Sequence, residues 1–219
     1  MKTALLFDLD GTLIDSDALH LQVFADMLAP RGVTIDDALF AEHIHGKSNR
    51  YIFSVLCPGE DADAWSDRKE AEFRRRLGGG VPQVAGTVAL LDLAEAQGWP
   101  VAVVTNAPRE NAEASLTAIG LRDRFDTIVL GDECARAKPE PDPYLEALRL
   151  LGADAAASLA FEDSPTGVQS AVAAGIPTVG RRSLLDDAAL RALGASLTID
   201  TFADPALTSL VEKLKGLPA

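Results

Sequence analysis

The sequence contains few cysteines, few aromatic residues and no long apolar run. Its two cysteines, Cys57 and Cys134, form no C-x-x-C motif and are too few for a disulfide framework, so we expect both to be reduced and structural. Aromatic residues make up only 5% of the chain, which disfavours a stacking surface for single-stranded nucleic acid. No apolar run approaches the roughly 20 residues that a membrane span requires, and the first residues do not resemble a secretory signal. We therefore expect a cytoplasmic protein.

Basic residues are also scarce relative to acidic ones. Lys and Arg number 20 against 33 Asp and Glu, which gives a net charge of −13. This excess of negative charge repels nucleic acid and anionic membranes, so we expect neither as a partner. A site for a phosphorylated small molecule would need local positive charge from a metal ion and a few basic residues. We expect a monomer or a weak dimer.

A stretch near the start of the chain joins an apolar run to two closely spaced carboxylates. The run Ala4-Leu5-Leu6-Phe7 leads into Asp8-Leu9-Asp10-Gly11-Thr12, which is typical of a buried parallel strand with acids at its carboxyl end. Two carboxylates so close repel each other unless a cation such as Mg²⁺ neutralises them. Asp8 could then attack phosphorus, with Asp10 as the proton carrier. Taken alone, the same pattern also fits an acidic cap and turn.

Further apolar runs alternate with helical segments after residue 84. This alternation predicts βαβ units and a parallel sheet of the α/β class, with the doubly wound, Rossmann-like arrangement. The expected strands after the first are at 101–104, 127–130, 158–161 and 177–179.

The segment between the first and second strands shows only helical patterns. Helices are expected at 17–29, 36–43, 49–56 and 63–77, and we find no convincing strand among them. We therefore expect an α/β core domain formed by residues 1–14 and 81–219, with an all-helical domain inserted over residues 15–80.

Polar residues follow two more strands and occupy one stiff loop. Thr105-Asn106 follows the second strand and Glu162-Asp163 follows the fourth, while Lys138 precedes a proline-rich stretch. Each has an ordinary structural explanation when taken alone: a turn, a helix start or a solvated lysine. Together they supply a nucleophile, metal ligands, donors to phosphoryl oxygens and a proton carrier, which phosphoryl transfer requires.

With these segments in this order, the chain resembles the haloacid dehalogenase superfamily, in its Mg²⁺-dependent phosphatase and phosphomutase branch with a helical cap. The four family motifs are matched by Asp8-Leu9-Asp10-Gly11-Thr12, Thr105-Asn106, Lys138-Pro139 and Phe161-Glu162-Asp163-Ser164. The resemblance covers essentially the whole chain. It implies that the helical segment is a mobile cap that closes over the site and excludes water.

The resemblance also implies a role for each matched residue. Asp8 is the nucleophile and a metal ligand, and Asp10 is the acid and base and offers its backbone carbonyl to Mg²⁺. Asp163 completes the protein ligands, with Glu162 as a direct or outer-sphere helper. The remaining motif residues hold the transferring phosphoryl group: Thr105, Asn106 and Lys138.

The helical segment contains the candidate substrate-binding residues. His20 lies on its first helix, where the resemblance implies a residue that faces the site, although an ordinary helix histidine explains it equally well. The stretch Gly46-Lys47-Ser48-Asn49-Arg50 resembles the substrate loop of the family's cap. Lys47 or Arg50 could bind a second charged group of the substrate, or could simply be solvated.

The expected function is a Mg²⁺-dependent phosphatase of small phosphorylated metabolites, of the sugar phosphate or phosphoglycolate type, that acts through an aspartyl-phosphate. A beta-phosphoglucomutase-like phosphomutase is the alternative. Mutases of this kind resemble the chain less well, because Asn49 stands where they have a basic residue and Ala107-Pro108 where they have Ser-Lys. A phosphonoacetaldehyde hydrolase would use a cap lysine, as Lys47 could be, but lacks the second acid that Asp10 supplies.

Overall fold

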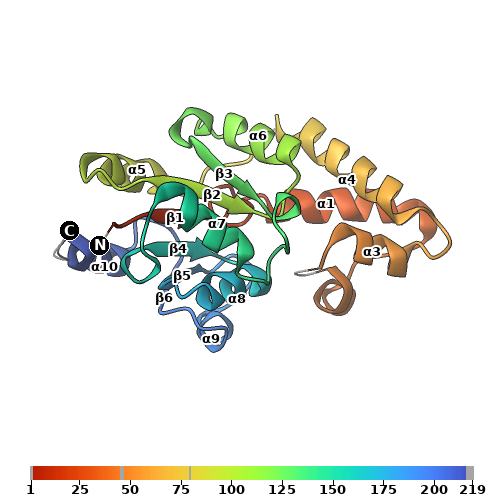
Figure 1. Cartoon of the computed structure of the whole chain (residues 1–219). Helices are drawn as coiled ribbons and strands as arrows, with labels where there is room; N and C mark the ends of the chain where they lie inside the picture. Colours follow the sequence, from red (N-terminus) through yellow and green to blue (C-terminus); the bar gives the residue numbers. More distant parts are fainter. Residues whose placement is uncertain (1, 45–46, 79, 216–219) are drawn as a thin grey trace. The chain divides into compact units, whose positions relative to one another are not determined.

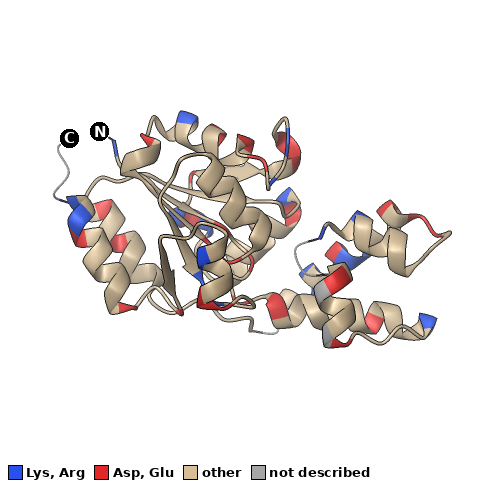
Figure 2. Ribbon diagram, turned by 90° about the horizontal axis from the view of Figure 1, so that it is seen from below, with Lys and Arg blue, Asp and Glu red and all other residues tan. Residues whose placement is uncertain are grey.

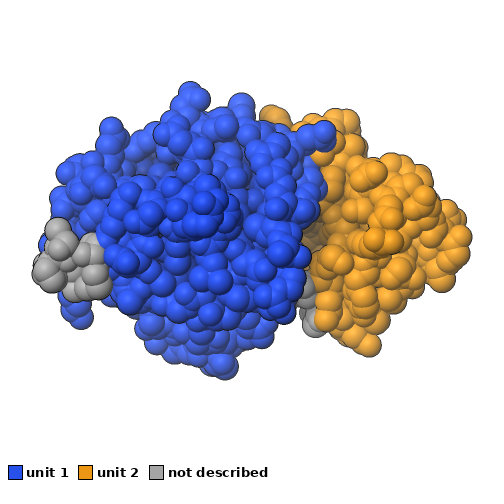
Figure 3. Space-filling view, in the orientation of Figure 1, with its two compact units in different colours: residues 1–15, 82–219 blue, residues 16–81 orange. Residues whose placement is uncertain are grey.

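A computed structural model of the chain describes residues 2–44, 47–78 and 80–215. The chain forms two compact units, one made of Met1–Asp15 and Pro82–Ala219, the other of Ser16–Val81 (Figure 3). The chain leaves and re-enters the first unit at adjacent points, since the Asp15 N–H donates a hydrogen bond to the Pro82 carbonyl at 3.0 Å. The second unit is therefore an insertion between two consecutive strands of the first.

The first unit is built on a six-stranded parallel sheet, which confirms the predicted α/β class (Figure 1). The strand order is β3-β2-β1-β4-β5-β6, so the direction in which successive strands are added reverses between β1 and β4. In such sheets the crevice at this reversal is the usual ligand site. The strands are β1 (Leu5–Phe7), β2 (Val101–Thr105), β3 (Thr127–Leu130), β4 (Leu159–Glu162), β5 (Thr178–Arg181) and β6 (Leu197–Ile199).

Both faces of the sheet are buried. Alternate residues of each strand point to opposite faces, so each face has its own set of apolar side chains. On one face Leu6, Ala102 and Ala160 belong to an apolar cluster that also includes residues of α7 and α8. On the other face the rings of Phe7 and Phe161 stack with their centroids 4.8 Å apart. The helices of this unit are α5 (Thr87–Ala96), α6 (Arg109–Ala118), α7 (Asp142–Leu151), α8 (Pro165–Ala173), α9 (Asp187–Ala192) and α10 (Pro205–Lys215).

The second unit consists of helices in the part that the structure describes. Its core joins Phe24, Phe53 and Trp65, which come from three different helices. Ser48 caps the start of α3, since its hydroxyl accepts a hydrogen bond from the Tyr51 N–H. The helical segments are α1 (Asp17–Leu28), η1 (Ala29–Arg31), α2 (Asp37–Leu39), η2 (Phe40–Ile44), α3 (Asn49–Leu56) and α4 (Ala62–Leu77).

The helix expected over residues 36–43 is present over residues 37–44, but it is not a single α-helix. The chain forms one short α-helical segment, α2, and continues as the π-helix η2. Leu39 and Ile44 both pack on the core of this unit, and they are five residues apart. A π-helix places residues at this spacing near each other, so the apolar pattern here fits the wider turn.

Acidic and basic residues occur on helices of both units (Figure 2). Acidic residues outnumber basic ones in both units, 22 to 12 in the first and 11 to 8 in the second. Among the described residues, no helix combines the length and the apolar character that crossing a bilayer demands.

Candidate active site

The polar residues expected to act together follow neighbouring strands of the sheet. β1 lies between β2 and β4, with Phe7 opposite Val103 on one side and Phe161 on the other. The backbone N–H of Asp8 donates to the Phe161 carbonyl at 2.9 Å, so the pairing continues one residue beyond β1. Asp8 therefore lies beside Glu162, the last residue of β4, at the reversal point of the sheet.

The ammonium group of Lys138 connects these strands. Its Nζ atom donates to Asp8 Oδ1 at 2.7 Å and to Glu162 Oε1 at 2.6 Å. A third hydrogen bond of 2.6 Å goes to the carbonyl of Val104 in β2. An ammonium has three N–H groups, and all three are satisfied here. The Lys138 side chain is only 2% exposed, so this loop lysine is not a solvated surface residue.

Asn106 and Thr105 fix the loops around this lysine. The Asn106 side chain donates to the Lys138 carbonyl and accepts from the Lys138 N–H, both at 3.2 Å. The hydroxyl of Thr105 accepts a hydrogen bond from the Ala107 N–H at 3.0 Å. A hydroxyl that accepts one bond still has its own proton to donate. Thr105 can therefore donate to a phosphoryl oxygen without breaking this turn.

Asp163 is held by hydroxyl groups on both of its oxygens. Thr12 donates to Oδ1 at 3.2 Å, and Ser183 donates to Oδ2 at 2.7 Å. Gly11 lies directly against this carboxylate, where a Cβ atom would come within 2.0 Å of Oδ2. Gly11 also has a φ of +74°, which residues with side chains rarely adopt. Both facts require glycine at this position.

The carboxylates of Asp8, Glu162 and Asp163 form a buried cluster. One oxygen from each lies within 4.8 Å of the others, and three negative charges face the single positive charge of Lys138. Glu162 Oε2 is buried and has no hydrogen-bond partner in the described part of the chain. A hard cation such as Mg²⁺ prefers carboxylate oxygens, so this donor set fits such an ion.

The buried position changes the acid strength of both charged partners. Burial and the nearby Glu162 carboxylate raise the pKa of Asp8 well above its usual value, although Lys138 opposes this change. Burial by itself would lower the pKa of Lys138. The Asp8 and Glu162 carboxylates outweigh this effect and raise that pKa above its ordinary value. Lys138 therefore stays charged, and any further positive charge beside Asp8 would favour its ionised form.

Asp10 lies at the turn that follows β1. It is half-buried, and its backbone forms an isolated bridge with Ile14. Its side chain is not one of the three clustered carboxylates. Its role as an acid and base stays a prediction.

His20 belongs to a polar group inside the helical unit. His20 Nδ1 lies 2.8 Å from Lys69 Nζ, and the His20 ring stacks on Phe73 with centroids 4.0 Å apart. Lys69, which is only 3% exposed, also pairs with Glu70 at 3.0 Å. Asn49 donates a hydrogen bond to the same Glu70 carboxylate. The sequence singled out His20 but not its two charged neighbours.

Two other candidate residues of the helical unit, Lys47 and Arg50, lie at its surface. Lys47 is exposed, with its ammonium 5.6 Å from the centre of the Tyr51 ring. Arg50 pairs with Asp63 at 3.3 Å, and both side chains are largely exposed. Gly46 lies outside the described residues. The substrate-binding roles of these residues stay predictions.

Two side chains at the carboxylate cluster had no role assigned from the sequence. The Tyr144 hydroxyl donates to Glu162 Oε1 at 2.7 Å, and Ser183 contacts Asp163 as described above. Tyr144 lies just beyond the proline-rich stretch that follows Lys138, which the sequence pattern singled out without assigning a role to this tyrosine. Ser183 follows β5 and carries no pattern that would distinguish it.

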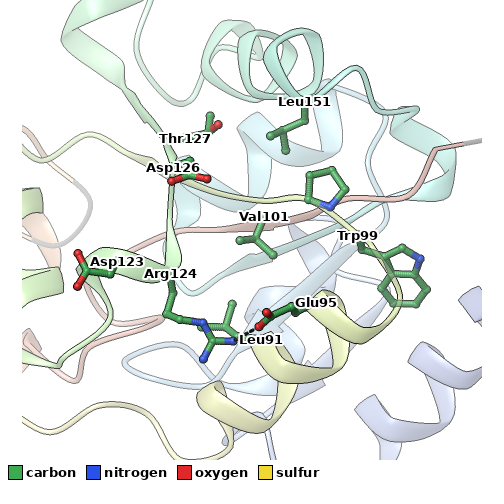
Figure 4. A pocket seen from close by; sticks show the side chains of 10 residues that line it. Leu91, Glu95, Trp99, Val101, Asp123, Arg124, Asp126, Thr127 and Leu151 are labelled. Carbon is green, nitrogen blue, oxygen red and sulfur yellow. Dashed lines mark ion pairs between the residues drawn. The ribbon is translucent and has the colours of Figure 1, made fainter.

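A pocket of about 440 Å³ lies elsewhere on the first unit (Figure 4). Its lining includes Val101 and Thr127, which are the first residues of β2 and β3. The carboxylate cluster lies at the carboxyl ends of the parallel strands, so this pocket lies at their opposite, amino-terminal ends. Arg124 and Glu95 face each other across it at 3.5 Å. The pocket is therefore separate from the candidate active site.

Comparisons with known proteins identify the family to which the chain is similar. The profile of the family described as haloacid dehalogenase-like hydrolase matches residues 5–181, which include all four polar segments. Phosphoglycolate phosphatase from Rhodospirillum rubrum is 34% identical over 218 residues, covering 93% of this chain and 89% of that protein. Protein CbbY from Rhodobacter capsulatus is 34% identical over 189 residues, covering 80% of this chain and 83% of that protein.

Solved structures of related proteins have a fold similar to that of this chain. A crystal structure of a CbbY variant from Rhodobacter sphaeroides, in complex with xylulose-1,5-bisphosphate, is similar to this chain with a TM-score of 0.78. The two sequences are 26% identical, and the match covers 93% of this chain and 96% of that one.

Proposed function

The chain belongs to the haloacid dehalogenase-like hydrolase family, and we propose that it is a Mg²⁺-dependent phosphatase of small phosphorylated metabolites. The observation that carries the proposal is the buried contact of Lys138 with Asp8, beside the Glu162 and Asp163 carboxylates. This arrangement combines a carboxylate nucleophile, a fixed positive charge and ligands for a hard cation.

In the proposed reaction Asp8 is the nucleophile. Its carboxylate oxygen attacks phosphorus, the bond from phosphorus to the ester oxygen breaks, and Asp10 donates a proton to the departing alcohol. Asp10 then accepts a proton from a water molecule that attacks the phospho-aspartate, which releases phosphate and restores Asp8. Asp10 is two residues from Asp8 at the same turn, so both groups can serve one substrate.

The surrounding residues supply positive charge and hydrogen-bond donors. Lys138 places a positive charge beside Asp8, which favours the ionised carboxylate, and it could exchange one of its present hydrogen bonds for one to a phosphoryl oxygen. Thr105 and Asn106 lie at the end of β2 and would orient the phosphoryl group. Asp8, Glu162 and Asp163 would hold Mg²⁺, with the Asp10 carbonyl as a further ligand. When bound, the ion would neutralise these carboxylates and the charge on the phosphoryl oxygens.

The substrate proposal draws on the relatives and on the helical unit. One relative is named phosphoglycolate phosphatase, and a CbbY crystal structure contains a sugar bisphosphate. We therefore propose a small phosphorylated acid or sugar as the substrate class. We also propose that the helical unit acts as a cap, in which His20, Gly46, Lys47 and Arg50 contact the part of the substrate away from the phosphoryl group.

The test is phosphate release from a panel of phosphoglycolate and sugar monophosphates, with and without Mg²⁺. We expect release from one or a few compounds, dependent on Mg²⁺. Asp8→Asn should lower this release by a factor on the order of 10⁴ or more while the circular dichroism spectrum is unchanged. Substantial release by this variant would exclude Asp8 as the nucleophile. If no compound loses phosphate but β-glucose 1-phosphate becomes the 6-phosphate, the phosphomutase alternative holds instead.

A further inference from the structure

The loop after β5 reaches the carboxylate cluster through Ser183. The Ser183 hydroxyl donates to Asp163 Oδ2 at 2.7 Å, while Thr12 donates to Oδ1 at 3.2 Å. Asp163 is only 6% exposed. The two hydroxyls come from loops that are far apart in the sequence, and each binds a different oxygen of the same carboxylate. Together they restrict rotation of the carboxylate plane.

The loop that carries Ser183 is itself anchored. The Arg181 guanidinium donates to the Gly11 carbonyl at 2.6 Å and pairs with Asp15 at 3.2 Å. The Ser183 N–H donates to the Arg181 carbonyl at 3.0 Å, which ties the serine to this anchor. The Ser183 hydroxyl is therefore held at the cluster by the backbone and by a neighbouring arginine.

Such an arrangement matters for metal binding. A carboxylate oxygen has two lone-pair directions, so a hydroxyl that donates to one of them fixes the direction in which the other points. Groups that hydrogen-bond a metal ligand orient it, and their loss typically weakens metal binding by about 10–100-fold. From these contacts we propose that Ser183 is a positioning residue that orients Asp163 to bind a divalent cation. The inference rests on the proposed function, because that function places the cation at Asp163.

The test compares Mg²⁺ binding to the whole protein and its variants by titration calorimetry, without substrate. We expect Ser183→Ala to bind Mg²⁺ about tenfold more weakly. Ser183→Thr keeps the hydroxyl and should retain nearly the wild-type affinity. Ser196→Ala is the matched control, because that hydroxyl also makes one hydrogen bond, of 3.0 Å to the Thr178 carbonyl, in the same unit but before β6. This control should bind Mg²⁺ as the wild type does.

Activity measurements distinguish a loss of Asp163 orientation from a general loss of folded structure in the variant. In Ser183→Ala the Mg²⁺ concentration for half-maximal phosphate release should rise about tenfold, while kcat at saturating Mg²⁺ should stay close to wild type. If wild-type protein binds Mg²⁺ and Ser183→Ala binds it equally well, the inference is wrong but the proposed function stands. If the wild type binds no Mg²⁺, both the inference and the proposed metal dependence are wrong.

Discussion

At the scale of single residues, burial gives the ion pairs of Lys138 an importance that surface pairs lack. Lys138 is 2% exposed and its partners Asp8 and Glu162 are 11% and 0% exposed. Removal of one partner from such a group leaves uncompensated charges away from water, which destabilises a protein by about 3–5 kcal/mol. An exposed pair typically contributes only about 0–1 kcal/mol.

Lys138→Ala should therefore lower the free energy of unfolding by about 3–5 kcal/mol in Mg²⁺-free buffer. The matched control is Lys215→Ala on α10, because Lys215 pairs with Glu212 at 2.7 Å but lies nearer the surface. That change should cost no more than about 1 kcal/mol. Urea unfolding followed by circular dichroism measures both values. An equal decrease in the free energy of unfolding in the two variants would show that the buried pairs stabilise the protein no more than an exposed pair does.

At the scale of one element, α4 carries a cluster of charges on its last turns. Glu72 accepts hydrogen bonds from Arg75 and from Arg76, three and four residues later on the same helix. The hydrogen bonds from Arg75 and Arg76, together with the charges of both arginines, lower the pKa of Glu72 to about 2. Arg76 also pairs with Asp26 of α1 at 2.6 Å, so the cluster links two helices of the helical unit.

The pKa of Glu72 predicts how the stability effect of this cluster depends on pH. A carboxylate whose pKa is lower in the folded than in the unfolded protein stabilises the fold above the unfolded pKa of 4.5, and this effect is lost as pH falls toward 2. Glu72→Gln should therefore lower the melting temperature slightly at pH 6, and the difference from wild type should shrink below pH 4.5. Glu146→Gln, which loses a single arginine partner on α7, should have a smaller effect. Scanning calorimetry across this pH range measures both. A difference that grows toward low pH would contradict the prediction.

At the scale of the whole molecule, the net charge of −13 and the buried acids both favour cation binding. A ligand that binds only the folded protein stabilises it by about 2.7 kcal/mol at a concentration 100 times its Kd. General screening of the excess charge by salt also stabilises the folded chain, without any specific site. A test of metal binding through stability must separate these two effects.

Mg²⁺ at 100 times its measured Kd should therefore raise the free energy of unfolding of the wild type by about 2.7 kcal/mol. NaCl at the same ionic strength should give a clearly smaller increase, and Asp163→Asn should respond to both salts alike. Urea unfolding in each buffer measures the effect. Equal stabilisation by the two salts in the wild type would argue against a specific cation site.

The sequence by itself determined the fold class, the strands and the polar segments at their ends. Apolar runs and helical periodicity are local patterns, so they located β1 through β5 and showed that Asp8, Thr105 and Glu162 would end strands. The family resemblance rests on the same segments. The helix expected at residues 36–43 is also present, but most of it is a π-helix, whose wider turn fits the apolar spacing there.

Only the tertiary structure decided which of these groups touch one another. Lys138 reaches Asp8 across 130 positions of the sequence, and Ser183 reaches Asp163 across 20. No periodic pattern encodes such contacts, because they depend on the order in which the strands pair and on how each loop is anchored. The reversal of strand order between β1 and β4 brings the separate strand ends together. That placement turned a loop lysine into a buried partner of the expected nucleophile, and an unremarked serine into a neighbour of the acidic cluster.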